Sequence, residues 1–308
     1  MNLPKVTTII PSFNHAKYIE QAMQSVLDQE YPDIQLIVVD DGSSDDSHEV
    51  IRDFCERNPG VIAILNEENR GQSAVMNQAM LKATGEFIQL LPSDDWYLPQ
   101  KTRLQVQKFM AGPPSLGVVY ARGYRYFEDE DRMVEWGHAP THRGNVLRPL
   151  IESGNFVYPV TPMFRKECFE KEPFDETYRA EGEAIYPRIA RHFEFDFIED
   201  FVAVMRDHSY NIGKDAAVMY REINRYYDRV FSDPSLPADL RALEPVVRAR
   251  HHRTKGLQLI RDRGEPALGR SSLIEAIKYR PVLLLDPKVV GGIVLSFLAK
   301  DRTEKHAS

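Results

Sequence analysis

Two adjacent carboxylates follow a short apolar run and are well suited to chemistry. The run Glu86–Leu91 resembles a strand, a Pro-Ser turn ends it, and Asp94 and Asp95 come next. Because strand interiors exclude aspartate, the pair is expected at the carboxyl edge of a sheet, where open α/β sheets bind ligands. Neighbouring carboxylates repel unless a cation holds them, and their hard oxygens suit Mg²⁺ or Mn²⁺, which could bind a diphosphate. The alternative is a solvated turn that caps the next helix.

A second acidic pair and an arginine occupy similar places in the chain. Asp40 and Asp41 end the apolar run Ile34–Val39 and precede a Gly-Ser-Ser turn. A carboxylate there can accept a hydrogen bond from a nucleotide base, or it can stabilise the turn. Arg70 lies in the loop before a later helix, where it is either a surface charge or a ligand for a diphosphate.

The elements that must position these groups alternate between strand and helix. Amphipathic helices separate four short apolar runs, which predict strands at Val6–Ile10, Ile34–Val39, Val61–Leu65 and Glu86–Leu91. This order predicts an α/β fold in which helices cover both faces of a mostly parallel sheet. The turn after the first strand reads PSFN and lacks the glycine pattern of a dinucleotide-binding fold.

The second half of the chain has a different pattern. Strands are expected within residues 116–127 and at Phe156–Phe164 and Phe195–Met205, with a helix at Ala184–His192. From about Gly213 the sequence becomes helical and rich in arginine, tyrosine and leucine. We therefore expect a helical extension at the end of the chain.

Composition excludes several classes of protein. The 308 residues are 43% hydrophobic and 28% charged, which is an ordinary globular balance. A net charge of −7 argues against a nucleic-acid partner bound through a broad basic surface. Cys55 and Cys168 are far apart, so neither a disulfide framework nor a cysteine metal site is expected. No signal peptide or membrane-spanning segment is evident, which favours a cytoplasmic protein.

Three segments, in this order, resemble the inverting family-2 glycosyltransferases of the GT-A fold. They read VTTIIPSFNHAKYIEQAMQSVLDQEYPDIQLIVVDDGSSDDS, NRGQSAVMNQAM and GEFIQLLPSDDW. The resemblance is strong over residues 5–110 and weaker to about residue 210. It implies a Rossmann-like α/β/α domain with a nucleotide-sugar-binding half at residues 1–110 and an acceptor half at residues 111–212. Residues 213–308 would form the helical extension.

The resemblance also implies roles for individual residues. Asp95 would bind the cation, and Asp94 would lie near the ribose and the metal. The family commonly has another aspartate two residues before Asp94, where this chain has Pro92. His208 matches a histidine that often approaches the metal or the diphosphate, although a structural role is the alternative. The nucleotide would meet Asp41 at its pyrimidine base and Arg70 at its diphosphate, with the base pocket lined by Pro11 and Phe13.

The resemblance fails at the catalytic base. When the segment is aligned on Arg188, the family's basic aspartate falls on Gly182, which cannot accept a proton. An inverting transferase needs a carboxylate within reach of the acceptor hydroxyl. Glu183 and then Glu181 are the candidates, unless the base lies elsewhere. Both are also explained as charges that stabilise a helix N-terminus.

The expected function is metal-dependent transfer of a sugar, with inversion, from a UDP-type or dTDP-type donor. The acceptor would be a hydroxyl of a saccharide or glycoconjugate, in polysaccharide or glycoconjugate synthesis, with Mn²⁺ or Mg²⁺ as cofactor. The alternative from another class is a catalytically weak nucleotide-sugar-binding homologue that acts as a partner or regulatory subunit. A nucleotidyltransferase is less favoured, because no glycine-rich basic loop follows the first strand.

The segment Pro281–Lys300 carries apolar residues at helical spacing with basic residues around them. The first interpretation is a helix packed on its own domain or on the partner in a homodimer. The second is a helix that lies on a membrane, which would make the protein peripheral at the inner face of the membrane.

Overall fold

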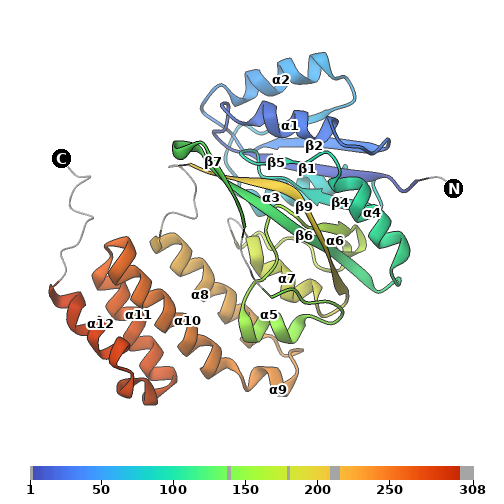
Figure 1. Ribbon diagram of the computed structural model, residues 1–308. Coiled ribbons are helices and arrows are strands. Elements are labelled where there is room, and N and C mark those ends of the chain that lie inside the picture. Colours follow the sequence, from blue (N-terminus) through green and yellow to red (C-terminus); the bar gives the residue numbers. More distant parts are fainter. Residues whose placement is uncertain (1–2, 137–139, 179–180, 209–215, 299–308) are drawn as a thin grey trace. The chain divides into compact units, whose positions relative to one another are not determined.

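The computed structural model describes residues 3–136, 140–178, 181–208 and 216–298 (Figure 1). Contacts divide the chain into two compact units. The first comprises Met1–Leu150 with Gly154–His208, and the second comprises Ile151–Ser153 with Ser209–Ser308. The α/β part and the helical part are therefore described separately.

The first half of unit 1 confirms the predicted alternation of strands and helices. The elements are β1 (Val6–Ser12), α1 (Ile19–Leu27), β2 (Ile34–Asp40), α2 (Ser47–Arg57), β3 (Ile62–Leu65), α3 (Gln72–Met80) and β4 (Phe87–Leu90). Strands β1, β2 and β3 pair in parallel, and β1 also pairs in parallel with β4. Helices α1 and α2 lie together over one face of this sheet (Figure 1).

The sheet continues through the second half of unit 1. Its order is β3-β2-β1-β4-β8-β6-β9-β5, with β7 paired to β6. The chain builds outward from β1 to β3 and then returns to place β4 on the other side of β1. This reversal makes the carboxyl ends of β1 and β4 the switch point of the sheet, which is where open α/β sheets form a ligand crevice.

The remaining elements of unit 1 complete the sheet and add further helices. They are β5 (Trp96–Tyr97), α4 (Lys101–Ala111), β6 (Leu116–Phe127), β7 (Arg132–Glu135), α5 (Leu147–Ser153, whose last three residues belong to unit 2), β8 (Met163–Arg165), α6 (Glu167–Lys171), α7 (Ile185–Ile189) and β9 (Glu194–Asp207). Short 3₁₀ turns at Glu128–Glu130 and Gly182–Ala184 follow β6 and precede α7.

The predicted strand Phe156–Phe164 is wrong over most of its length. Only Met163–Arg165 forms a strand, which pairs antiparallel with β4 and β6. Pro159 and Pro162 have no backbone N–H to donate to a neighbouring strand, and Thr161 donates its own to Tyr158 in a turn.

Apolar side chains from the strands and covering helices hold the sheet rigid. One cluster joins Ile10 of β1 and Val38 of β2 to Met23 of α1 and Phe54 of α2, all fully buried. Each such side chain contributes roughly 1.5–3 kcal/mol by leaving water. The strand ends from which the loops at the carboxyl edge begin are therefore held in fixed positions.

Unit 2 is helical, as the sequence predicts. It contains α8 (Ala216–Ser232), α9 (Ala238–Arg241), α10 (Glu244–Gln258), α11 (Pro266–Tyr279) and α12 (Pro287–Leu298). Gly256 and Gly269 let the backbones of α10 and α11 approach closely, because a Cβ on Gly256 would lie 2.8 Å from the Gly269 carbonyl oxygen. Within the described residues, no helix has both the length and the apolar character needed to cross a membrane.

A partly buried histidine in α10 gives unit 2 a predicted sensitivity to acid. Burial, reinforced by the neighbouring charges of His252, Lys255, Arg248 and Arg250, lowers the pKa of His251 from its ordinary 6.5 to about 3. Between pH 6.5 and pH 3 the unfolded chain therefore binds a proton at His251 that the folded chain does not bind. The free energy of unfolding keeps the full contribution of neutral His251 above pH 6.5 and falls as the pH drops toward 3. By pH 5 the loss attributable to His251 is about 2 kcal/mol.

Urea unfolding of the wild type and of His251→Leu at pH 8 and pH 5 measures this effect. The variant should lose about 2 kcal/mol less than the wild type between the two pH values. Equal losses would show that His251 does not titrate in this way.

Candidate active site

The loops that follow β1 and β2 are tied together at the switch point. The backbone N–H of Asn14 donates to Ser43 Oγ at 2.7 Å, and the Ser44 N–H donates to Asn14 Oδ1 at 2.8 Å. Asn14 adopts a positive φ of 54°, which asparagine tolerates better than most residues. The His15 N–H donates to Ser47 Oγ at 3.1 Å. These bonds fix the direction of the chain at His15.

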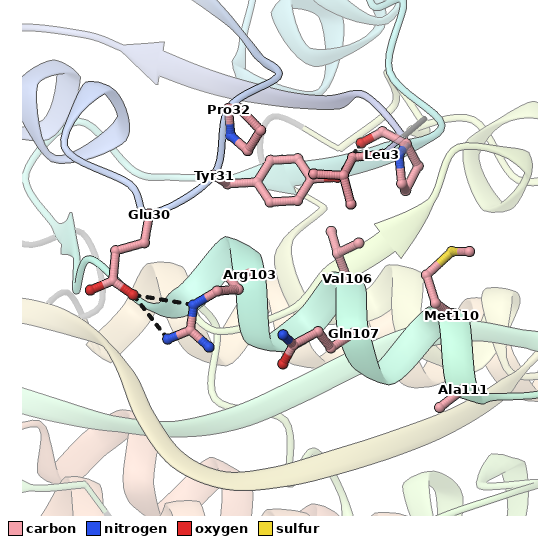
Figure 2. Close-up of a pocket in the computed structure, with 10 residues that line it drawn as sticks. Leu3, Glu30, Tyr31, Pro32, Arg103, Val106, Gln107, Met110 and Ala111 are labelled. Carbon is pink, nitrogen blue, oxygen red and sulfur yellow. Dashed lines mark hydrogen bonds and ion pairs between the residues drawn. The ribbon is translucent and has the colours of Figure 1, made fainter. Parts of the chain in front are cut away.

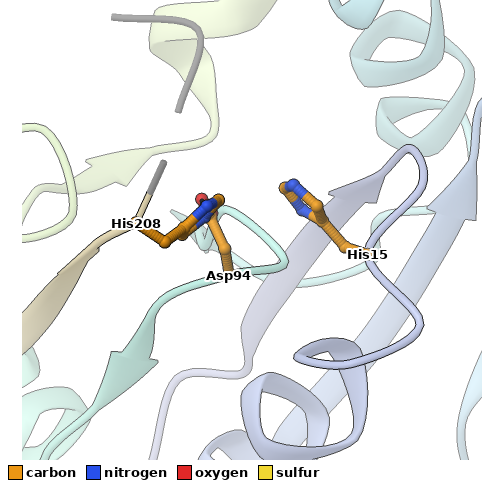
Figure 3. A group of neighbouring side chains, drawn as sticks. All are labelled: His15, Asp94 and His208. Atoms are coloured by element: carbon orange, nitrogen blue, oxygen red, sulfur yellow. Dashed lines mark hydrogen bonds and ion pairs between the residues drawn. The ribbon is translucent and has the colours of Figure 1, made fainter. Parts of the chain in front are cut away.

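Three side chains meet at the ends of β1, β4 and β9 and form a candidate metal centre (Figure 3). His15, Asp94 and His208 each offer a ligand atom, and these atoms lie within 4.8 Å of one another. His208 Nε2 lies 3.0 Å from Asp94 Oδ2. Burial lowers the pKa of His15, which favours the neutral imidazole that binds metal. Imidazole and carboxylate ligands both bind divalent cations, so the residues present fit a divalent metal ion.

Asp95 lies outside this group. Its Oδ1 accepts a 2.7 Å hydrogen bond from the backbone N–H of Arg206, and the residue is only 4% exposed. Burial, followed by the charge of Asp94, raises the pKa of Asp95 well above its usual value. The two adjacent carboxylates therefore have different environments, and the assignment of Asp95 as the metal ligand stays a prediction.

Arg206 holds the Asp94–Asp95 turn against β9. Its Nε donates to the Asp94 carbonyl oxygen at 3.0 Å, and its guanidinium lies 4.9 Å and 4.8 Å from the ring centres of Tyr18 and Trp96. Sequence reasoning missed both Arg206 and His15. Arg206 stands two residues before His208 and His15 stands in the turn after β1, but neither has a spacing that separates it from a surface residue.

The residues predicted to bind the nucleotide lie along the same sheet edge. Asp41 is buried and accepts hydrogen bonds from the backbone N–H groups of Arg70 and Gly71 at 2.7 and 2.9 Å. Its carboxylate thus fixes the loop before α3, while the Arg70 side chain is exposed. Phe13 is 40% exposed, as a residue that receives a ligand would be. Pro11 lines the neighbouring cavity.

Residues from both halves of unit 1 line that cavity, which has a volume of about 220 Å³. Pro11 and Pro92 line it from the ends of β1 and β4, and Gly182 and Glu183 line it from the turn before α7. Gly182 has a φ of +52°, and a Cβ there would meet nothing within 4 Å. The side chain of Glu183 is exposed beside it. Pro11, which is predicted to line the base pocket, and the predicted base position therefore line one cavity.

Glu181 lines the cavity too, but its carboxylate is engaged in a buried ion pair. Its two oxygens accept from Arg188 Nη1 at 2.5 Å and from the Asp175 N–H at 2.8 Å. Arg188 also pairs with Glu172 at 2.9 Å. This network anchors the turn that carries Gly182 and Glu183.

Glu181→Ala is expected to lower the free energy of unfolding by about 3 kcal/mol, because it leaves the guanidinium of Arg188 buried with one partner fewer. The side chain of Glu181 is fully buried and that of Arg188 is 9% exposed, so solvent screens the pair little. Urea unfolding of the variant beside Glu170→Ala, which removes an exposed glutamate, measures the difference. A loss no larger than that of Glu170→Ala would contradict the structural role of Glu181.

The sequence model of Glycosyl transferase family 2 matches residues 7–172, more than half of the chain. The chain belongs to glycosyltransferase family 2. This membership confirms the resemblance seen in the sequence, and the matched region contains Asp41, Arg70, Asp94 and Asp95. It ends before Glu181 and His208, so the family match does not extend to the predicted base or to the last ligand of the metal cluster.

Curated relatives of this family 2 glycosyltransferase match it over part of their length. An uncharacterized glycosyltransferase of Nostoc sp. (strain PCC 7120) is 30% identical over 172 residues, which cover 54% of this chain and 52% of the relative. The match to the next relative, an uncharacterized glycosyltransferase of Rickettsia bellii, covers only 25% of that protein. The chain thus spans about half or less of the length of these relatives.

Solved structures share the fold of the whole transferase chain. The mannosyltransferase PcManGT of Pyrobaculum calidifontis, solved with GDP-Man and Mn²⁺, has a TM-score of 0.63 and 19% identity, covering 97% of this chain and 87% of its own. TarS residues 1–349 of S. aureus, solved with UDP, has a TM-score of 0.62 and 17% identity, covering 95% and 88%. The fold is therefore GT-A, with a helical part at the carboxyl terminus.

The transferase has a larger hollow of about 630 Å³ at the opposite, amino-terminal edge of the sheet (Figure 2). Apolar side chains line most of it, including Leu3, Val106 and Met110, and a Glu30–Arg103 ion pair of 2.9 Å lies at one side. Glu30 and Arg103 are the only charged residues that line this hollow. The smaller cavity, lined by residues at the ends of β1 and β4, is therefore the candidate active site.

Proposed function

We propose that this transferase moves a sugar from a nucleoside diphosphate donor to a hydroxyl acceptor with inversion, assisted by Mn²⁺ or Mg²⁺. The observation that carries the proposal is the placement of the His15, Asp94 and His208 cluster at the switch point. The cavity lined by Pro11, Pro92 and Glu183 lies at the same edge. The cluster and the cavity support a cation and a carboxylate that act together on a diphosphate and an acceptor.

The donor half of the site suits a nucleoside diphosphate. Asp94 and His208, with His15 as a third ligand, would hold the cation, and a bound cation would neutralise the charge of the leaving diphosphate. The exposed Arg70 side chain can pair with phosphate oxygens. Asp41, Pro11 and Phe13 are assigned to the base pocket. The GDP-Man and Mn²⁺ bound by PcManGT and the UDP bound by TarS support this class of donor.

Glu183 is the proposed general base. Its exposed carboxylate would take the proton of the acceptor hydroxyl while the acceptor oxygen bonds to the anomeric carbon. The bond from that carbon to the diphosphate oxygen breaks on the opposite side, so the configuration inverts. Glu181 is less suited, because both of its oxygens already accept hydrogen bonds inside the protein. We assign the product to polysaccharide or glycoconjugate synthesis.

Calorimetric titration with UDP, dTDP and GDP, with Mn²⁺ and with EDTA, tests the donor half of the proposal. One nucleotide should bind in the presence of Mn²⁺ and lose most of its affinity in EDTA. The matching sugar nucleotides are then incubated with a panel of saccharide acceptors, and release of the nucleoside diphosphate is followed. Nucleotide binding without turnover on any acceptor would favour a regulatory homologue, and no nucleotide binding would overturn the proposal.

A further inference from the structure

The last helix of unit 2 presents an apolar surface that nothing within the described residues covers. Of the 17 large hydrophobic side chains that are exposed in the described residues, eight lie between Val282 and Leu298. On α12, Val290, Val294, Phe297 and Leu298 follow one another at helical spacing and are 42%, 55%, 70% and 77% exposed. These four residues define the α12 apolar face.

The opposite side of α12 is packed, so the exposed face is not a misplaced core. Val289, Gly292 and Ser296 are buried. A Cβ on Gly292 would lie 2.8 Å from Leu257 and 2.9 Å from Leu273, which belong to α10 and α11. The helix is therefore docked on its own unit by small residues, and its large apolar residues point away.

Basic residues lie on α12 and in the segment before it. Lys278 and Arg280 are exposed at the end of α11, seven or more residues before α12, and Lys278 pairs with Glu275. Lys288 is the only charged residue of α12. The guanidinium of Arg270 lies 4.3 Å from the ring centre of Phe297. Residues 209–308 contain 18 Lys and Arg and 12 Asp and Glu, a net charge of +6, so the remaining 208 residues carry −13 of the total of −7. Positive charge is thus concentrated in the unit that bears the apolar face.

We infer that the α12 apolar face docks on the surface of an anionic lipid bilayer. Apolar side chains enter the boundary between headgroups and acyl chains, while lysines and arginines of unit 2 pair with lipid phosphates. The 12 residues of α12 extend about 18 Å, too short to cross a hydrocarbon core of about 30 Å, so the helix lies along the surface.

Charge favours a bilayer over a second copy of the chain. A homodimer through this face would bring together two segments 209–308, each of net charge +6, whereas an anionic surface is attracted to each of them. This inference does not rest on the donor chemistry proposed for unit 1, because it concerns residues of unit 2 alone.

Flotation of the full chain with vesicles tests the inference. The wild type should float with vesicles of phosphatidylcholine and phosphatidylglycerol, more weakly with phosphatidylcholine alone, and more weakly at high salt. The double variant Val294→Glu/Leu298→Glu should bind the anionic vesicles at least about tenfold less tightly. Leu81→Glu, which changes an 86% exposed leucine in α/β unit 1, should bind like the wild type.

Two further measurements decide the remaining outcomes. Circular dichroism melting checks that the double variant keeps its fold, and Lys288→Glu/Arg280→Glu should weaken binding to anionic vesicles with α12 still apolar. Absence of flotation, or flotation that the double variant leaves unchanged, overturns the inference. A dimer in sedimentation that the double variant dissociates, without vesicle binding, assigns the face to a second copy instead.

Discussion

Asp94→Asn is expected to lower kcat/KM for sugar transfer by a factor of about a hundred or more. The substitution removes the one carboxylate of the His15, Asp94 and His208 cluster while keeping the shape of the side chain. A neutral amide is a weak ligand for Mn²⁺, so the cation and the diphosphate it would hold both lose affinity. Because a factor of a hundred corresponds to about 2.7 kcal/mol, one metal ligand is sufficient to account for the effect.

Asp95→Asn is the matched control, because it neutralises the adjacent carboxylate. Asp95 is buried and accepts from the Arg206 N–H, and an asparagine oxygen can accept the same bond. Mn²⁺ affinity, measured by electron paramagnetic resonance with and without UDP, should fall strongly in Asp94→Asn and little in Asp95→Asn. The reverse order would identify Asp95 as the ligand, as the family resemblance implies. Equal affinities in both variants and the wild type would place the cation elsewhere.

Glu183→Gln is expected to lower kcat by a factor of about 10² to 10⁴ with little change in donor affinity. Glutamine keeps the size of the side chain but cannot take the proton of the acceptor hydroxyl. Glu183 is exposed and does not belong to the metal cluster, so cation binding should not change. A loss confined to kcat would therefore locate the defect in the chemical step.

Steady-state kinetics with saturating donor, together with titration of UDP in Mn²⁺, separates kcat from donor binding. Glu170→Gln, an exposed glutamate of α6, provides the control for removal of a surface charge. If Glu183→Gln keeps full activity, the base lies on another residue. Activity lost together with UDP affinity would indicate that Glu183 acts on the donor site rather than on the acceptor.

Local sequence was sufficient for the strands, helices and sheet edge of the nucleotide half. Buried strands in a parallel sheet need unbroken apolar runs, and helices need apolar residues at intervals of three and four. The pattern of apolar residues in Ile34–Val39 and in the helix after it is therefore sufficient to predict both elements. Aspartates that directly follow such runs can only lie at the carboxyl edge. The placement of Asp41 and of the Asp94–Asp95 pair at the ends of β2 and β4 therefore needed no tertiary information.

Tertiary structure alone decided which side chains meet. Neighbouring side chains leave the backbone in different directions. Asp95 accepts a hydrogen bond from the Arg206 N–H, which is 111 residues away in the sequence, while Asp94 contacts His208. Similarly, Glu181 pairs with Arg188 in the interior and Glu183 stays exposed. Such pairings depend on contacts between distant strands, for which no local periodicity exists. The sequence by itself determined that the acidic residues lie at the carboxyl edge of the sheet. The packing of β9 against the turn after β4 determined which side chains come together at that edge.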